Sequence, residues 1–195
     1  MEQLVFASSN AHKVEEVRKI LGLTSDTLLS LEDIGWMDEI EETGTTLTEN
    51  ALIKSRIIAT AKNINVFSDD SGLEVEALDM APGVYTARYA GPQKDANDNM
   101  DKLLKALDGV ANRKARFRAV IALIINGEEH LFEGIVNGHI AHQKTGEGGF
   151  GYDPIFIPEG YEKSFAELPD ALKNTMSHRF RAVDQMRQFL EQKNI

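Results

Sequence analysis

The chain has 195 residues, of which 42% are hydrophobic, and a formal net charge of −10 at pH 7. This size is enough for one domain with a substantial core and room for two lobes around a cleft. The acidic balance argues against a nucleic-acid duplex as partner. The absence of cysteine excludes disulfides and thiol catalysis. With no signal peptide and no long apolar run, we expect a soluble cytoplasmic protein without a membrane partner.

The N-terminal segment has the pattern of a strand, a polar turn and a helix. Leu4–Ala7 is a short apolar run, Ser8–Asn10 is polar, and the spacing of apolar residues in Val14–Leu21 predicts a helix. The free N–H groups and the positive dipole end of such a helix favour an anion, and Lys13 in its first turn suits a polyphosphate. The alternative is an ordinary N-cap followed by a solvated lysine.

A second acidic segment, Asp38–Gly44, precedes a long predicted helix. Thr46 and Glu49 have the spacing of a capping box, so we expect the helix to begin there and run to about residue 62. Glu42, or its neighbour Glu41, can supply a carboxylate to a metal. Lys54 lies about two turns along the helix and can face the same cleft. The alternative is a solvated acidic loop.

Two adjacent acids, Asp69 and Asp70, follow an apolar run and precede Ser71 and Gly72. Because successive side chains of a strand point to opposite faces, the two acids should have different roles. One carboxylate can bind Mg²⁺, while the other orients an attacking water or supports the site. Ser71 and the N–H groups near Gly72 can hold phosphate oxygens. The alternative is an acidic β-turn.

The later chain alternates strand and helix patterns, which predicts an α/β fold. Residues 115–125 read as a central strand, and residues 129–140 are predicted to return beside it after the Asn126-Gly127 turn. His139 and His142 have a zinc-like spacing without a third ligand, so we interpret them as an ordinary strand end. A final helix with one apolar core face is predicted from Phe180, Val183, Met186, Phe189 and Leu190.

Taken together, several ordered motifs resemble the inosine/xanthosine triphosphate pyrophosphatase family, from the first predicted strand to the last helix. The motifs are Ser8–Lys13, Glu42–Gly44, Glu49–Ala51, Asp69–Gly72, Pro82–Gly91, Gly148–Pro154, Lys173 and Ser177–Arg179. Two positions depart from many relatives: Ser68 stands in place of alanine, and Ser9 in place of glycine, threonine or histidine. The resemblance implies an α/β fold with a mixed, curved central sheet flanked by helices and two lobes around a nucleotide-binding cleft. It also implies a single nucleoside triphosphate pyrophosphatase domain over residues 1–195.

The same resemblance implies Mg²⁺-dependent hydrolysis of ITP, dITP and XTP between the α and β phosphates, which cleanses the nucleotide pool. It further implies a homodimer. Asp70 matches the proton-accepting, metal-linked carboxylate of the family and Glu42 its upstream metal acid, and Asp69 is a further candidate metal ligand. The candidate substrate-binding residues are Ser8, Ser9, Asn10, Ala11, His12, Lys13, Lys54, Ser71, Phe150, Gly151, Tyr152, Asp153, Lys173, His178 and Arg179.

The later motifs suit a purine nucleoside. Phe150 can stack on the base, the glycines beside it allow close backbone approach, and Asp153 before Pro154 is biased to an extended conformation. His178, Arg179 or backbone N–H groups can favour a purine 6-carbonyl over the amino group of adenine, and such polar contacts discriminate strongly. The alternatives are an ordinary glycine-rich loop and a cap on the last helix.

A mechanistic hypothesis follows from these matches. Mg²⁺ held by Glu42, Asp70 and Asp69 neutralises the triphosphate, while Asp70 orients or deprotonates a water for in-line attack at the α-phosphorus. The positive charges that counter the pyrophosphate leaving group are those of Lys13, Lys54, Lys173 and Arg179.

Three other functions remain open. A Maf-like pyrophosphatase would cleave the same bond but prefer pyrimidine or modified nucleotides, and the segments Phe150–Asp153 and Ser177–Arg179 argue against it. A non-catalytic nucleotide-binding module would bind without Mg²⁺-dependent turnover, whereas the acidic residues argue for catalysis. A structural interaction protein would have little need for these separated lysines and acids.

Overall fold

The computed structural model describes residues 3–193, although not the side chains of His12 and Asp170. The chain divides into two compact units. Unit 1 comprises Met1–Asp70, Ala119–Gly134 and Arg179–Ile195, and unit 2 comprises Ser71–Arg118 and Ile135–His178. No helix within residues 3–193 is both long enough and apolar enough to cross a membrane.

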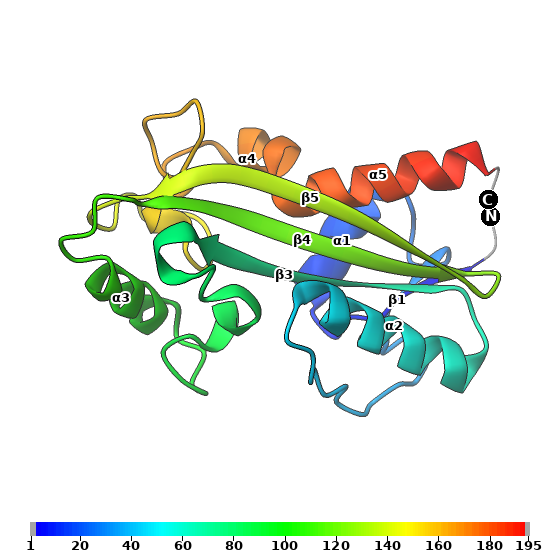
Figure 1. Ribbon diagram of the computed structural model, residues 1–195. Coiled ribbons are helices and arrows are strands. Elements are labelled where there is room, and N and C mark those ends of the chain that lie inside the picture. The colour runs from blue at the N-terminus through cyan, green and yellow to red at the C-terminus, as the bar shows by residue number, and fades with distance from the viewer. Residues whose placement is uncertain (1–2, 194–195) are drawn as a thin grey trace. The chain divides into compact units, whose positions relative to one another are not determined.

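Six strands form one open sheet in the order β2-β1-β3-β4-β5-β6, of which Figure 1 labels β1, β3, β4 and β5. β1 pairs in parallel with β2 and with β3, whereas β5 pairs antiparallel with β6, so the sheet is mixed. The strands are β1 (Leu4–Phe6), β2 (Leu28–Leu29), β3 (Val66–Val75), β4 (Lys114–Ile125), β5 (Glu128–Ile140) and β6 (Phe156–Pro158). The predicted mixed sheet flanked by helices is therefore confirmed.

The two longest strands, β4 and β5, are joined by the predicted two-residue turn. Asn126 and Gly127 both have positive φ, 52° and 80°, which is the backbone that a tight hairpin turn requires. The seven residues Ala119–Ile125 at the end of β4 are all buried, which explains why this stretch is continuously apolar. β5 ends at Ile140, so the strand-end interpretation of the histidine pair is confirmed.

The helices begin and end where local signals place them. The long helix α2 starts with a capping box in which the Thr46 side chain accepts from the Glu49 N–H and Glu49 bonds back to Thr46. α2 ends at Asn63, which has a left-handed backbone, and α1 ends similarly at Gly22. The helices are α1 (Ala11–Leu21), α2 (Leu47–Lys62), α3 (Ala96–Ala106), α4 (Asp170–Met176) and α5 (His178–Gln192), with 3-10 helices η1 (Glu76–Leu78), η2 (Gly83–Arg88) and η3 (Asp153–Ile155).

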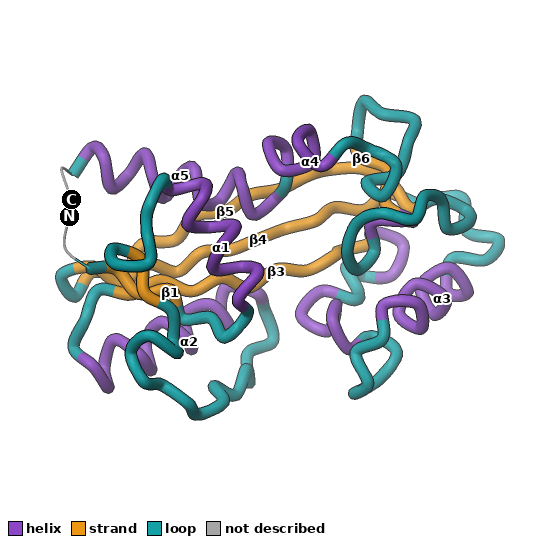
Figure 2. Tube along the Cα trace, turned by 180° about the vertical axis from the view of Figure 1, so that it is seen from behind, coloured by secondary structure: helices purple, strands orange, loops and turns teal. Residues whose placement is uncertain are grey.

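Unit 1 has a core on each face of its part of the sheet. α1 and α5 cover one face (Figure 2). There Val17 and Met186 pack with Phe6 and Phe67, whose rings stack at 4.7 Å. α2 covers the other face through Ile58. The side chains of consecutive strand residues therefore point to opposite faces of the sheet, one covered by α1 and α5 and the other by α2.

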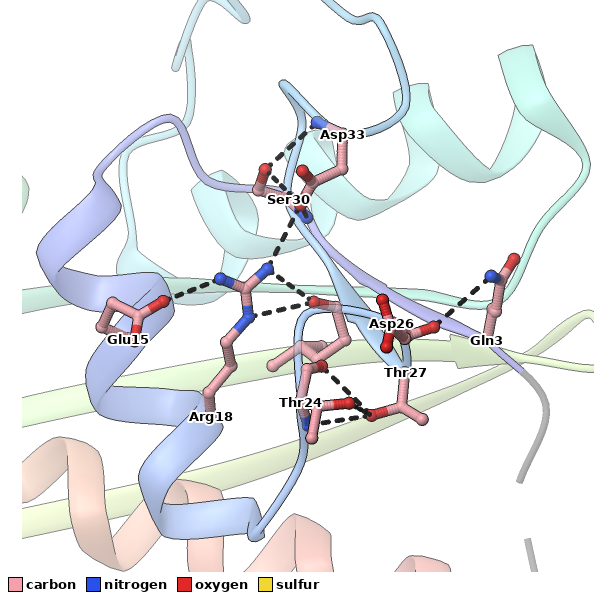
Figure 3. Close-up of polar contacts among 9 residues, drawn as sticks. Gln3, Glu15, Arg18, Thr24, Asp26, Thr27, Ser30 and Asp33 are labelled. Atoms are coloured by element: carbon pink, nitrogen blue, oxygen red, sulfur yellow. Dashed lines mark hydrogen bonds and ion pairs between the residues drawn. The ribbon is translucent and has the colours of Figure 1, made fainter.

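Arg18 of α1 fastens the short strand β2 to the rest of unit 1 (Figure 3). Its guanidinium donates to the carbonyl oxygen of Leu28 from Nε at 3.1 Å and from Nη2 at 2.8 Å. It also pairs with Glu15 at 2.7 Å and with Asp33 at 3.2 Å. Because β2 has only two residues, these side-chain contacts add to the few ladder bonds that hold it.

Unit 2 has a separate core between α3 and its own parts of the strands. Phe117 and Phe156 pack at 4.6 Å, and Leu103 of α3 is buried in the same cluster. Arg113 donates to the carbonyl oxygens of Ile140, Ala141 and Leu107, so one guanidinium ties the end of β5 to the end of α3.

Candidate active site

The turn before α1 is a helix cap, and the lysine that follows it is only partly exposed and forms an ion pair. The side chain of Asn10 accepts from the Lys13 N–H at 3.2 Å, and Ser8 Oγ accepts from the Asn10 N–H at 3.2 Å. Lys13 Nζ lies 3.1 Å from both carboxylate oxygens of Asp69. The cap of the alternative interpretation is therefore present, but Lys13 pairs with Asp69, and phosphate binding at this helix start stays a prediction. The side chain of His12, a predicted substrate contact, lies outside the described part of the structure.

Asp69 is the centre of a buried charge cluster. Its side chain is 3% exposed and contacts Lys13 and, at 3.3 Å, Arg179 at the start of α5. Arg179 also donates to Glu16 of α1 at 2.7 Å. Burial alone raises the pKa of Asp69, but the nearby positive charges outweigh it and hold this pKa well below its usual range. Burial likewise lowers the pKa of Arg179, and the charges of Asp69 and Glu16 reverse the effect.

Asp70 has a different set of neighbours, which come from the α2 side. Burial raises the pKa of Asp70 to about 6; the charge of Glu42 adds to the rise, while Lys54 and a hydrogen bond from Asn50 oppose it. Lys54 Nζ lies 2.5 Å from Glu42 Oε1, and although burial lowers the pKa of Lys54, the surrounding carboxylates raise it above its usual value. The two adjacent acids thus differ in their partners, as the alternation of a strand predicts.

Asn50 fixes the loop that carries Glu42. Its side chain is 1% exposed, and its Oδ1 accepts from the Gly44 N–H at 2.8 Å. A Cβ at Gly44 would lie 2.6 Å from this oxygen, so the close approach requires glycine there. The capping box of α2 and this contact together place the acidic loop beside the first turns of the helix.

The metal-ligand prediction is only partly reflected in the geometry. Among the described residues, no group of three or more His, Asp or Glu side chains is arranged to hold a metal ion. Glu42 and Asp70 interact electrostatically, whereas both oxygens of Asp69 face Lys13. The role of Asp69 as a metal ligand therefore stays a prediction.

In unit 2, Asp153 organises the predicted nucleoside-binding segment. Its carboxylate is buried, accepts from the Phe150 N–H at 2.7 Å and pairs with Lys173 of α4. Gly149 has a φ of +88°, and a Cβ there would lie 2.6 Å from Asp153 Oδ2. Phe150 is 85% exposed, so the loop holds an aromatic side chain in solvent while the bond from its N–H to Asp153 fixes its backbone.

Two other predicted substrate contacts have internal partners. Tyr152 is 3% exposed, and its hydroxyl donates to the carbonyl oxygen of Thr86 at 2.8 Å. The ring of His178 stacks on Phe117 with centroids 5.1 Å apart. Ser71 is half-buried in β3. Residues with such internal contacts can support the site as well as contact a ligand directly.

The structure thus gathers the predicted residues into groups. In unit 1 it brings Lys13 to Asp69 and Arg179, and Lys54 to Glu42 and Asp70; in unit 2 it brings Phe150 and Lys173 to Asp153. The side chains that sequence analysis did not assign to the site are Glu16, Asn50 and Thr86. Glu16 lies three residues after Lys13, and this helical spacing was the available signal.

Comparisons with known proteins identify the family. The model of the Ham1 family matches residues 4–189. The dITP/XTP pyrophosphatase of Flavobacterium johnsoniae is 50% identical over 184 residues, which are 94% of this chain and 95% of that protein. The protein of the same name from Porphyromonas gingivalis is 51% identical over 191 residues, 97% and 98% of the two chains.

The solved structures agree with the sequence relatives. The structure of the Staphylococcus aureus Ham1 protein matches with a TM-score of 0.92 and 40% identity, and the match covers 98% of this chain and 100% of that chain. A Ham1 protein from Coxiella burnetii matches with a TM-score of 0.91 at 36% identity, covering 98% and 100% of the two chains. The chain therefore belongs to the Ham1 family, which confirms the resemblance that the motifs indicate.

Proposed function

We propose that the protein is a Mg²⁺-dependent pyrophosphatase that hydrolyses ITP, dITP and XTP to the monophosphate and pyrophosphate, and so removes non-standard purines from the nucleotide pool. Relatives that match nearly the whole chain are named dITP/XTP pyrophosphatase. The observation that carries the proposal is the contrast between adjacent acids. Asp69 is held ionised by two cations, whereas Asp70 has a pKa raised to about 6. Such divergent environments are typical of catalytic carboxylates.

The donor set around Asp70 fits a magnesium ion. Mg²⁺ usually binds through one or two protein carboxylates and completes its shell with water and substrate phosphate, so three protein ligands are not required. Glu42 and Asp70 would hold it, because the negative charge of Glu42 raises the pKa of Asp70 and a divalent cation would relieve that repulsion. When bound, the ion would neutralise triphosphate charge.

The residues of unit 1 have distinct proposed roles. Asp70 accepts the proton of the attacking water, and a bound cation would keep its carboxylate in the ionised form that a base requires. Lys13, Lys54 and Arg179 counter the negative charge of the pyrophosphate leaving group. The N–H groups of Ser9 and Ala11, on either side of the N-cap Asn10, bind phosphate oxygens, as the N-terminus of a helix does for anions.

The residues of unit 2 hold the nucleoside in this proposal. Phe150 stacks on the purine, supported by its exposed ring and by the bond from its N–H to Asp153. Lys173, which pairs with Asp153, supplies further positive charge. His178, together with Arg179 of unit 1, favours the 6-carbonyl of hypoxanthine or xanthine over the amino group of adenine.

We also propose that residues 1–195 act as a single pyrophosphatase domain, as a homodimer in the cytoplasm. The relatives match along nearly their full length, which supports one functional domain. Nucleoside triphosphates are the substrates of nucleic-acid synthesis, which supports an enzyme located where they are used. Sedimentation equilibrium of the purified protein measures the assembly, and a monomer mass at working concentration would overturn the homodimer.

A substrate panel tests the proposed function. Pyrophosphate release is measured from ITP, dITP, XTP, ATP, GTP and dTTP, with Mg²⁺ and with a chelator. We expect Mg²⁺-dependent turnover of the first three and poor use of ATP and GTP. A preference for dTTP would instead indicate a Maf-like activity, and nucleotide binding without turnover would indicate a non-catalytic module.

A further inference from the structure

Thr86, in the 3-10 helix η2, connects two segments of unit 2 that carry predicted substrate contacts, Ser71 in β3 and Phe150–Asp153. Its hydroxyl accepts from the backbone N–H of Leu73 at 2.8 Å and donates to the carbonyl oxygen of Gly83 at 2.6 Å. A threonine hydroxyl has one proton to donate, and here it is committed to one carbonyl while the oxygen serves one N–H. The side chain is therefore held in a single orientation, between β3 and the turn of η2.

The backbone of β3 leaves no space for adjustment at this point. A Cβ at Gly72 would lie 2.4 Å from the carbonyl oxygen of Gly83 and 3.0 Å from Thr86 Oγ1. Gly72 follows Ser71, the predicted phosphate contact, and Leu73 is fully buried. The position of the Ser71 backbone thus depends on how closely η2 packs against β3.

The carbonyl group of Thr86 reaches the second segment. It accepts from the hydroxyl of Tyr152, which is 3% exposed. Burial raises the pKa of Tyr152, so the hydroxyl stays protonated and remains a donor over the physiological range. Tyr152 stands between Phe150 and Asp153 in the predicted nucleoside-binding segment, whose backbone is itself bonded to Asp153.

We infer that Thr86 is a positioning residue that sets the placement of Ser71 relative to the nucleoside-binding segment. The residue touches neither substrate nor metal in this proposal and acts through Leu73 and Tyr152. The inference rests on the proposed function for the meaning of the two segments, although the contacts themselves do not depend on it. Loss of the hydroxyl should weaken nucleotide binding more than the chemical step, because the residues it places bind the ground state and the transition state alike.

The test compares Thr86→Val, which removes the hydroxyl and keeps the branched shape, with Thr86→Ser, which keeps the hydroxyl. For Thr86→Val we expect a rise in KM for ITP of about tenfold, equal to about 1.4 kcal/mol, with kcat little changed. Thr86→Ser should restore KM to near the wild-type value. An unchanged KM in Thr86→Val, or a serine variant as impaired as the valine variant, would overturn the inference.

The chain offers a matched control at Thr27 in unit 1. Its hydroxyl accepts from the Thr24 N–H at 3.0 Å and donates to the Thr24 carbonyl oxygen at 3.1 Å, so Thr27→Val removes the same pair of bonds. We expect no change in KM from it. If Thr86→Val does not fold, Tyr152→Phe removes the other bond of Thr86, and a wild-type KM in that variant would contradict the proposal.

A second readout does not require turnover. Amide hydrogen exchange, followed by mass spectrometry, should speed up in Thr86→Val both around Leu73 and around Tyr152, although the second site is distant in sequence. Faster exchange around Leu73 alone would show a local structural role and overturn the positioning role. A wild-type protein that fails to hydrolyse ITP would refute the proposed function, and the exchange result would still decide the role of Thr86.

Discussion

Neighbouring carboxylates in one strand can contribute to stability with opposite signs, and Asp69 and Asp70 illustrate it. Asp69 is paired with Lys13 and Arg179, so its ionised form stabilises the folded state. Asp70 has a pKa raised to about 6 from an ordinary value of 3.8, so its ionised form destabilises the metal-free folded state. A carboxylate whose negative charge destabilises the metal-free protein is expected to bind a cation or a proton.

The first prediction concerns the pH dependence that Asp70 causes. Because its folded-state pKa lies above the unfolded one, the folded state binds the proton more tightly, and stability falls as pH rises from about 4 to about 6. The measurement is the free energy of unfolding by urea in the presence of a chelator. Across this pH range the stability of Asp70→Asn relative to the wild type should increase by about 3 kcal/mol in total. At higher pH the difference between the two proteins should stay constant. A constant difference between the two proteins would contradict the assignment.

The second prediction concerns Asp69→Asn. Like Asp70→Asn, it replaces a carboxylate by an amide of similar shape, but we expect it to lower the stability instead of raising it. Removing this charge leaves the partly exposed Lys13 without its carboxylate and the more buried Arg179 with Glu16 alone. We expect a loss of about 3 kcal/mol or more at neutral pH, measured by the same urea unfolding. A variant as stable as Asp70→Asn would show that the pairing contributes nothing.

At the scale of elements, α2 is held to the sheet by a pair of buried hydroxyls. Ser68 Oγ donates to the carbonyl oxygen of Ala51 at 2.5 Å, Ser55 Oγ donates to that of Ala122 at 2.6 Å, and the two hydroxyls lie 2.9 Å apart. Two protons serve three contacts, so the proton of Ser55 is divided between two acceptors. Lys54, which pairs with Glu42, is the neighbour of Ser55 in the helix.

The third prediction tests whether Ser68 is structural. In Ser68→Ala, Ser55 still bonds to Ala122 and the carbonyl group of Ala51 keeps its helical bond, so we expect a loss of about 1 kcal/mol of unfolding free energy. Ser68 lies two residues before Asp70, and its hydroxyl bonds to Ser55 and Ala51 of α2, so kcat/KM for ITP should stay within about twofold. A large loss of kcat/KM in a folded variant would assign Ser68 to the site.

Sequence patterns predict the local elements well and the long-range pairs poorly. The capping box of Thr46 and the turn at Asn126 are signals within a few residues, and the structure has both. Arg179 was predicted as a substrate contact, but its pairing with Asp69, 110 residues away, follows from the packing of α5 on the sheet. The role of Thr86 depends on η2, a short 3-10 helix without a strong periodic signal.

At the scale of the whole molecule, the fourth prediction concerns metal binding. A ligand that binds only the folded state stabilises it by mass action, so Mg²⁺ should raise the melting temperature of the wild type. Glu42→Gln should reduce this rise in melting temperature, because the charge of Glu42 acts on Asp70 and the two carboxylates are the proposed ligands. Glu41→Gln is the matched control, since Glu41 is exposed and adjacent. Equal shifts in all three proteins would exclude Glu42 as a ligand, and loss of the shift in Glu41→Gln alone would assign the role to Glu41.

The central claim is the bond that is cleaved. The most direct measurement is the identification of both products from ITP and Mg²⁺, by ion-exchange chromatography, for the wild type and Asp70→Asn. We predict IMP and pyrophosphate in equal amounts from the wild type and almost no product from the variant. IDP and inorganic phosphate, or full activity in Asp70→Asn, would contradict the proposed pyrophosphatase and the role of its paired acids.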